Sequence, residues 1–268
     1  QAHIKANEIM TGSTNGGGLG YIVWWDLIRV IKCRNSKNKK IFRHLTLHSK
    51  IVITLTLVLV IVGAALIFAF EYSNPLTIGD MSVVDKLQVS FFQSVTTRTA
   101  GFASIPQENL TNASAMISII LMLIGGSPVG TAGGIKTVTV AVLICSAFAT
   151  IRNKNSATLF GRQISANSVK KSIAVVVTFM TICISSTVSL MATNNVSFID
   201  AIYETVSAAA TVGLSRSLTP ALNLAGKIII IITMYFGRVG PISLAVALGS
   251  KDESQNVISE PVEEISIG

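Results

Sequence analysis

Two short glycine-bearing turns contain the residues best suited to bind an ion. Thr211-Val212-Gly213-Leu214-Ser215 lies between two long apolar segments, and Thr99-Ala100-Gly101-Phe102 lies in similar surroundings earlier in the chain. In a tight extended turn, backbone carbonyls can replace the water around a cation, and one glycine allows a conformation that other residues resist. The turns therefore predict two strands of a dehydrating cation filter, which needs about four strands to surround an ion. Ordinary outer loops are the alternative interpretation.

The same spacing relates the segments on either side of the two turns. The offset that places Gly101 on Gly213 also places Gly125 on Gly237 and Phe91 on Tyr203. The repeated unit is an apolar span, a short re-entrant helix, a glycine turn and a second span that is interrupted by glycines. An earlier glycine-rich segment, Gly17-Gly18-Leu19-Gly20, resembles the interruptions in these two units. Internal repeats with broken helices are common in transport proteins.

The composition is typical of a protein embedded in a bilayer. Half of the 268 residues are hydrophobic, only 13% are charged, and the mean hydropathy is +0.62. Soluble domains average about 25% charged residues. The windows Ile51–Phe70 and Ser172–Thr193 contain no charge, and each can span about 30 Å of hydrocarbon as a helix. We expect an all-α integral membrane protein of helix–pore-loop–helix units, as in potassium channels, with interrupted second helices.

The positive charge is concentrated in two connections. Loops 29–50 and 152–171 are rich in Lys and Arg, whereas the connections 71–113 and 194–225 contain six acidic residues and few basic ones. Because Lys and Arg flank membrane spans on the cytoplasmic side, both basic loops are predicted to be cytoplasmic in a multi-pass protein of the cell membrane. This distribution disfavours nucleic acid as the partner of the basic residues.

Segment 125–134 is predicted to be a non-helical loop inside the membrane. It combines a proline with a cluster of glycines, a composition that does not form a regular helix. Irregular backbone at membrane depth persists only where it is buried in protein or lines a water-filled pathway. We therefore expect this loop to lie at a pathway, with these glycines as candidate gate residues: Gly125, Gly126, Gly130, Gly133 and Gly134.

Three basic residues lie in or beside the apolar segments. Arg238 has long uncharged runs on both sides, and Lys136 follows the glycine loop. Charges inside a membrane usually face a cavity and have a function. Arg238 is predicted to face the pore as a gate or barrier, rather than to snorkel or pair structurally, and the same choice stays open for Lys136. Arg98 either orients the first turn by hydrogen bonds or reaches outer headgroups.

Several other site classes find little support in the residues. The run Gly130–Thr137 resembles a phosphate-binding loop, but Ile135 separates its glycine from its lysine, and that loop needs Gly-Lys adjacent. Cys33, Cys145 and Cys183 show no paired spacing for a disulfide or a metal. The spans contain no Ser/His, paired-Asp or His/Glu constellation. We therefore expect no enzyme, no cofactor, and no metal apart from potassium on the filter carbonyls.

Longer motifs resemble a known transporter family. Gln93-Ser94-Val95-Thr96-Thr97-Arg98-Thr99-Ala100-Gly101-Phe102, the run Thr131–Thr137 and Phe236-Gly237-Arg238-Val239-Gly240-Pro241 are similar to motifs of the Trk/Ktr/HKT superfamily of potassium transporters. The resemblance is closest to the membrane subunit of the bacterial Ktr (NtpJ-like) potassium-uptake system. It extends from Asn15 over nearly the whole chain and covers the C-terminal half of such a subunit.

The resemblance implies a pore built from four helix–pore-loop–helix units, each with one filter glycine. Gly101 and Gly213 match the third and fourth glycines, 125–134 matches the gating loop, and Arg238 matches a basic residue that contacts it. The implied organisation, in chain order, is a remnant of the second unit (1–28), a basic loop (29–50), the third unit (51–151), a second basic loop (152–171), the fourth unit (172–250) and a cytoplasmic tail (251–268).

The resemblance also implies ions and partners. Potassium is the expected transported ion, with sodium dependence left open, and the expected partners are a second subunit in a homodimer and a cytoplasmic ring of nucleotide-binding regulatory subunits. The N-terminal pore units are missing from this sequence, which favours a fragment of a longer subunit over a half-pore that pairs with another chain. The alternative function is a membrane anchor or scaffold that binds lipid or a partner through its basic loops, but an anchor has no use for glycine-rich backbone in the bilayer.

Overall fold

The computed structural model describes residues 19–32, 41–128, 133–154 and 156–240. Within these ranges the chain is mostly helical, and two helices, α4 (Leu47–Glu71) and α8 (Ala166–Thr193), are long and apolar enough to cross a membrane. Each contains one of the two uncharged windows found in the sequence. Gly130, the N-terminal remnant up to residue 18 and the tail 251–268 lie outside the described residues.

The segment predicted to be the third unit contains α4, α5 (Val83–Thr96), α6 (Asn112–Leu123) and α7 (Thr137–Ile151), with the short 3-10 helix η1 (Gln107–Asn109) before α6. The segment predicted to be the fourth unit contains α8, α9 (Phe198–Ala209), α10 (Leu218–Ala221) and α11 (Leu224–Val239), and the two segments are called by these names below. Before these units lie α2 (Tyr21–Lys32) and α3 (Ile41–His44), and the second basic loop contains a small antiparallel hairpin of β1 (Thr158–Leu159) and β2 (Arg162–Gln163).

The two short helices α5 and α9 begin in the same way. Ser82 and Ser197 each accept a hydrogen bond from the backbone N–H of the aspartate three residues later, and each donates its hydroxyl to that aspartate's carboxylate. This reciprocal pattern satisfies N–H groups at a helix start and places an acid at the positive end of the helix dipole. The offset that aligns the two turns would place Ser82 on Asn194 rather than on Ser197, so it holds at the turns but not at the helix starts.

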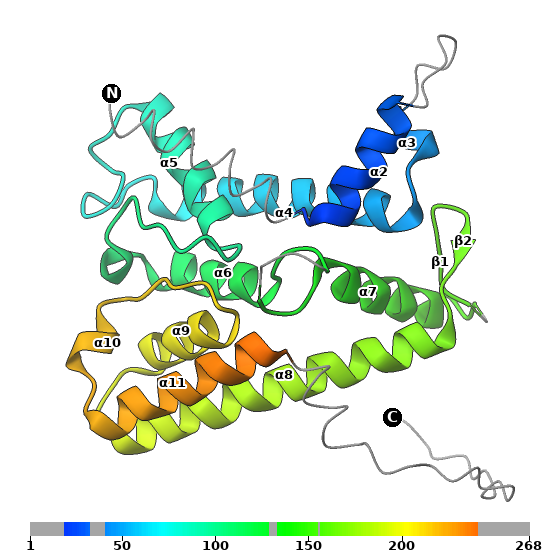
Figure 1. Ribbon diagram of the computed structural model, residues 1–268. Helices are drawn as coiled ribbons and strands as arrows, with labels where there is room; N and C mark the ends of the chain where they lie inside the picture. The colour runs from blue at the N-terminus through cyan, green and yellow to red at the C-terminus, as the bar shows by residue number, and fades with distance from the viewer. Residues whose placement is uncertain (1–18, 33–40, 129–132, 155, 241–268) are drawn as a thin grey trace, which may run out of the picture.

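The second span of the third unit is interrupted as the glycine pattern predicts. The helices α6 and α7 lie end to end between α4 and α8, separated by the glycine loop (Figure 1). The α6 helix packs against α4 of its own unit and against α9 of the next unit, and α7 contacts α4 and α8. The main apolar core therefore lies between the two units, where side chains of α6, α8 and α9 meet.

The second span of the fourth unit differs from the sequence prediction. The break was expected over Gly237–Pro241, but α11 continues through Gly237 and Arg238 and ends at Val239. Only at Gly240 does the backbone leave the helix, with a φ of 87°. A single glycine is tolerated inside a helix at a modest cost, and Gly237 has a packing reason to be there, because a Cβ at this position would overlap the backbone of Ala209.

Candidate ion-conduction site

The two predicted filter turns follow their helices with the same backbone conformation. Helix α5 leads to Thr99 with a φ of 66° and Gly101 with a φ of 74°, and α9 leads to Thr211 with a φ of 55° and Gly213 with a φ of 91°. In both turns a threonine and a glycine, two residues apart, adopt the left-handed region that side chains disfavour. The sequence repeat is therefore also a repeat of backbone geometry.

The turns also meet each other. A Cβ added at Gly101 would overlap the carbonyl oxygen of Val212, and one added at Gly213 would lie 3.9 Å from the Cα of Gly101. Gly101 is thus required both by its φ and by the close approach of the other turn, whereas Gly213 is required by its φ alone. Two segments from different units, far apart in the chain, face each other backbone to backbone.

Hydrogen bonds orient the peptide groups of both turns toward their own helices. The N–H groups of Ala100 and Gly101 donate to the Thr96 carbonyl at 3.1 and 3.3 Å, and the N–H of Val212 donates to the Ser207 carbonyl at 2.9 Å. The Thr96 hydroxyl also accepts from the N–H of Phe102 at 2.8 Å and donates to its carbonyl at 2.7 Å.

The carbonyls of the turns are left available. Within the described part of the chain, no hydrogen bond is donated to the carbonyl oxygens of Ala100, Gly101, Val212 or Gly213. The carbonyl ends of α5 and α9, which precede the turns, favour positive charge. Backbone oxygens that lack donors, at the negative ends of two helices, are the arrangement in which a dehydrated cation can be bound.

The remaining side chains of the predicted filter segments lie around this contact. Val212 and Leu214 are buried in the core between the units, while the Phe102 side chain is 48% exposed. Val212 and Leu214 thereby anchor the fourth turn, whereas the third turn is held at Phe102 by Thr96.

The glycine loop has a neck closed by backbone hydrogen bonds. Gly125 donates to the Ile135 carbonyl at 2.9 Å, Ile135 donates to Leu123 at 3.0 Å, and Thr137 donates to Gly126 at 3.2 Å. The chain that leaves α6 therefore runs beside the chain that enters α7. Residues 129–132, which connect these two segments in the sequence, are not among those described.

The neck of the loop lies directly against the fourth turn. A Cβ added at Gly133 would overlap the Thr211 hydroxyl and would lie 2.5 Å from the Ala210 carbonyl oxygen. A Cβ at Gly125 would in turn overlap the carbonyl of Gly133. Glycine is needed at both positions because the chain segments pack closely there. Two of the predicted gate residues, Gly133 directly and Gly125 through Gly133, are therefore in contact with the fourth turn.

Arg98 connects the third turn to the same neck. Its side chain is only 7% exposed, and its Nη2 donates to the Gly125 carbonyl at 3.2 Å. Of the two interpretations that the sequence left open, the structure supports a hydrogen-bonding role and not contact with outer headgroups. The partner is the glycine loop, however, and not the strand that Arg98 itself belongs to.

Lys136 and Arg238 lie close enough for their charges to repel each other. Lys136 is the N-cap residue of α7, at the neck of the loop, and Arg238 lies in the last turn of α11, next to the Gly237 that packs on Ala209. Both are engaged in interactions. Their predicted roles as pore-facing gate residues stay predictions.

A buried polar network behind the turns was missed by the sequence reasoning. Gln93 donates to the Oε1 of Gln107 at 2.6 Å, and Tyr203 donates its hydroxyl to the same atom at 3.0 Å. All three residues are at most 2% exposed. The network ties α5 to α9 through the loop that contains Gln107. The alignment of Phe91 with Tyr203 in the repeat partly indicated this network, because the fourth unit has a tyrosine hydroxyl at a position where the third unit has only a phenylalanine ring.

A second connection between the units lies beyond the turns. Arg216 pairs with Asp200 at 2.9 Å and donates to the carbonyls of Glu108 and Leu110 in the third unit, at 3.3 and 3.5 Å. The neighbouring Glu204 accepts hydrogen bonds from Ser215 and Thr219. The segment after the fourth turn is thereby fixed to both α9 and the preceding unit.

Comparison with known proteins identifies the class to which this fold and site belong. The family model of the TrkH cation transport proteins matches residues 15–259, so the chain belongs to this family of membrane cation transporters, which are not enzymes. The crystal structure of the potassium transporter TrkH from Vibrio parahaemolyticus has the same fold, with a TM-score of 0.70 at 16% identity, over 91% of this chain and 52% of that one. The predicted fold class is confirmed.

Several curated relatives are named as potassium-uptake proteins. The Ktr system potassium uptake protein B of Bacillus subtilis is 37% identical over 248 residues, which are 92% of this chain and 54% of that protein. Its counterpart in Vibrio alginolyticus is 38% identical over 87% of this chain and 50% of its own length. The potassium/sodium uptake protein NtpJ of Enterococcus hirae is 34% identical over 100% of this chain and 58% of its own length. The chain thus spans about half the length of these relatives.

Proposed function

We propose that this chain forms half of a potassium-selective pore that mediates potassium uptake across the cell membrane. The observation that carries the proposal is the meeting of Thr99–Phe102 with Thr211–Leu214. The N–H groups of Ala100, Gly101 and Val212 donate to the preceding helices, and the carbonyls of Ala100, Gly101, Val212 and Gly213 have no donor within the described residues. Two such strands supply half of the oxygens that a dehydrated cation needs, and two further units supply the rest. The names of the relatives support potassium as the ion.

The direction of transport follows from electrostatics. A membrane potential of 100 mV contributes about 2.3 kcal/mol for each charge that crosses the whole field. This potential concentrates potassium in the cell without a second ion, so the proposal does not require sodium. A sodium dependence is suggested only by the relative that is named a potassium/sodium uptake protein, NtpJ.

The proposed gate is the glycine loop 125–134. Its neck is in contact with the fourth turn through Gly133 and with the third turn through Arg98. A loop in that position obstructs the pathway on one side of the filter, and its glycines allow it to move without the side-chain overlap that larger residues would create. Lys136 and Arg238 are proposed to hold the loop in the obstructing position.

The proposed assembly has three further components. The first comprises two more pore units, which would correspond to the part of the longer relatives that this chain does not match. The second is another subunit in a homodimer with its own separate pore. The third is a cytoplasmic ring of nucleotide-binding regulatory subunits, in line with relatives that are named as parts of a Ktr system.

Serine substitutions at the two filter glycines test the function. In the assembled pore, Gly101→Ser is expected to abolish discrimination of potassium over sodium, because its side chain overlaps Val212 and its φ is strained. Gly213→Ser has only the φ strain to overcome and is expected to weaken discrimination less. Gly161→Ser is the matched control, since Gly161 has a φ of 75° with nothing within 4 Å. Uptake of both ions by a potassium-uptake-deficient bacterium is the measurement, and wild-type selectivity in both filter variants would disprove the assignment.

A further inference from the structure

The carboxylate of Glu204, on α9, bonds to the chain segment that follows the fourth turn. The residue is only 5% exposed. Its Oε2 accepts a hydrogen bond from the Ser215 hydroxyl at 2.8 Å, and its Oε1 accepts one from the Thr219 hydroxyl. Because Ser215 directly follows Leu214, one buried carboxylate holds the chain at the point where it leaves the predicted filter strand.

The segment that Glu204 holds contains two residues in a disfavoured conformation. Thr211, at the start of the strand, has a φ of 55°, and Ser217 has a φ of 61°. Residues other than glycine persist in this left-handed region only where the surrounding structure fixes them. The bond to Ser215 lies between these two positions, and the bond to Thr219 lies just after them. Both bonds are therefore placed to prevent the strand from relaxing.

Two other roles for this carboxylate fit the contacts less well. Both oxygens of Glu204 already accept hydrogen bonds from hydroxyl groups, so the side chain is not available as a ligand for an ion. The guanidinium of Arg216 pairs with Asp200, one turn earlier on α9, at 2.9 Å. Glu204 is therefore not the salt-bridge partner of Arg216, and the hydroxyls remain as the groups that it binds.

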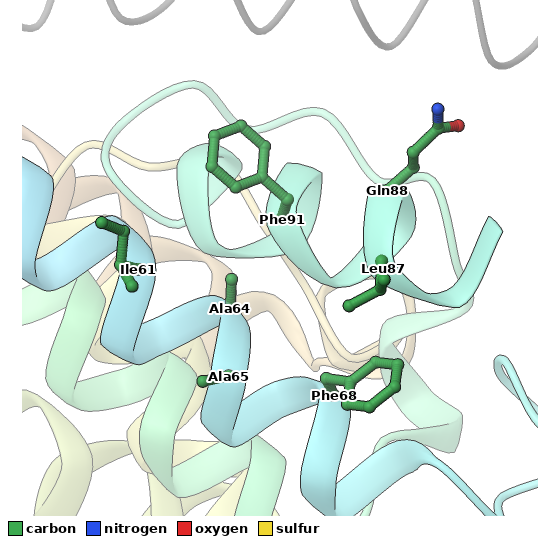
Figure 2. A pocket seen from close by; sticks show the side chains of 7 residues that line it. All are labelled: Ile61, Ala64, Ala65, Phe68, Leu87, Gln88 and Phe91. Carbon is green, nitrogen blue, oxygen red and sulfur yellow. The ribbon is translucent and has the colours of Figure 1, made fainter. Parts of the chain in front are cut away.

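The third unit has no carboxylate in this place. The offset that aligns the two turns places Phe92 on Glu204 and Gln88 on Asp200. Phe92 is a buried apolar residue. Gln88 is one of the residues that line an apolar groove between α4 and α5 (Figure 2), and its Oε1 has no hydrogen-bond partner within the described residues. These two positions therefore do not hold the segment after the third turn as their counterparts hold the segment after the fourth.

The third strand is held by a different side chain. The hydroxyl of Thr96 bonds to both backbone groups of Phe102, the residue after the turn glycine. The residue aligned with Thr96 in the fourth unit is Ala208, which has no hydroxyl. Each unit thus has one polar side chain that holds its strand just after the glycine, and that side chain is Glu204 in the fourth unit.

We propose that Glu204 is a positioning residue of the filter, which holds the fourth strand in the geometry that discriminates potassium from sodium and does not contact the ion. This inference rests on the proposed function, because it requires Thr211–Leu214 to be a filter strand. Discrimination between two cations of equal charge depends on the placement and number of the coordinating carbonyls. Release of one end of a strand therefore lowers selectivity more than it lowers the maximal rate of potassium uptake.

Substitutions of Glu204 test the proposal in the assembled pore. The measurement is uptake of potassium and of sodium by a potassium-uptake-deficient bacterium, at equal protein levels. Glu204→Ala removes the acceptor of both hydroxyls, and the potassium-to-sodium selectivity is expected to fall about tenfold, the scale of one hydrogen bond to a charged group. Glu204→Gln offers an oxygen to one hydroxyl and an amide to the other, so it is expected to restore most of the selectivity without the charge.

A second set of variants removes the same bonds from the hydroxyl side. Ser215→Ala is expected to lower selectivity several-fold, and Thr219→Ala is expected to lower it less because Thr219 lies farther along the chain from the strand. In the Glu204→Ala background, Ser215→Ala should cause no additional loss, since the bond between the two residues is already absent. If Glu204→Ala does not accumulate in the membrane, the two hydroxyl variants provide the test.

Glu71, at the end of α4, is the matched control. It is 0% exposed, and its carboxylate accepts hydrogen bonds from the Thr77 and Thr111 hydroxyls at 2.7 and 2.8 Å. Within the described part of the chain it makes no hydrogen bond to either turn. Glu71→Ala is therefore expected to lower the amount of protein and to leave the selectivity of the remaining protein unchanged.

The other outcomes overturn the inference. Wild-type selectivity in Glu204→Ala and Ser215→Ala, when Gly213→Ser lowers it, would reject the positioning role and leave the proposed function intact. Wild-type selectivity in all three would reject both. A loss in Glu204→Gln as large as that in Glu204→Ala would assign the effect to charge and not to hydrogen bonds. An equal loss in Glu71→Ala would assign it to general destabilisation.

Discussion

The Nη2 atom of Arg98 donates a hydrogen bond to the carbonyl of Gly125 at 3.2 Å, and this single contact joins the third turn to the neck of the glycine loop. The corresponding residue of the fourth unit, Ala210, has no side chain that could do the same. There the loop is joined directly, because Gly133 packs on the backbone of Ala210 and on Thr211. The neck of the loop is therefore fixed between the two turns, so movement of the neck and the shape of the filter are linked.

We predict that Arg98→Gln uncouples the loop from the third turn. The substitution removes a hydrogen bond of a charged donor, which typically contributes on the order of 1.5–3 kcal/mol. Potassium flux is expected to rise and discrimination against sodium to fall, whereas Arg98→Lys should keep part of both. The check is to measure potassium flux and selectivity together, at equal protein levels. If Arg98→Gln lowers only the amount of protein and leaves flux and selectivity unchanged, the role of Arg98 is purely structural.

Gly133→Ala is predicted to reduce potassium uptake strongly. Its Cβ would overlap the Thr211 hydroxyl and press on the Ala210 carbonyl, so the fourth turn is expected to shift out of its filter geometry. Gly161→Ala, in the hairpin of the basic loop, has a strained φ but no neighbour to displace and is expected to retain uptake. Comparable uptake in the two variants would argue against contact between loop and filter in the working pore.

Release of the proposed gate is expected to increase potassium uptake, the opposite of the effect predicted for Gly133→Ala. Arg238→Ala, or a deletion within 129–132, is expected to raise potassium flux while selectivity is spared, because each removes an obstruction outside the filter. Rubidium uptake at several potassium concentrations separates a higher maximal rate from a changed apparent affinity. Flux that is equal to or below wild type in both variants, at normal protein levels, would contradict a gating role.

Tyr203→Phe is predicted to destabilise the protein by about 1 kcal/mol, the usual net contribution of one hydrogen bond. The hydroxyl that donates to Gln107 is lost, while the bond from Gln93 to Gln107 remains. Thermal unfolding in detergent gives the measurement. Gln107→Leu should cost more, because it leaves both the Tyr203 hydroxyl and the Gln93 amide without their buried partner. Equal stability of all three proteins would show that the network does not hold the units together.

Much of the architecture could be predicted from local patterns. The uncharged windows, the glycine clusters and the constant offset between the two turns depend only on residue type and spacing, and they were sufficient to predict broken membrane helices and two equivalent turns. Gly101 and Gly213 were identified because a positive φ is a requirement of the residue's own backbone. The same approach failed for the end of α11, because Gly237 serves close packing on Ala209 and not a break.

The sequence by itself determined the helical membrane class, the repeated unit and the two turns, since each follows from short-range periodicity and backbone chemistry. Only the tertiary structure decided that the turns meet, that Arg98 bonds to Gly125, that Gly133 lies against Thr211, and that Gln107 joins two short helices. These contacts link residues that are well separated along the chain. No local propensity specifies them, because they arise from the packing of one segment or unit on the next.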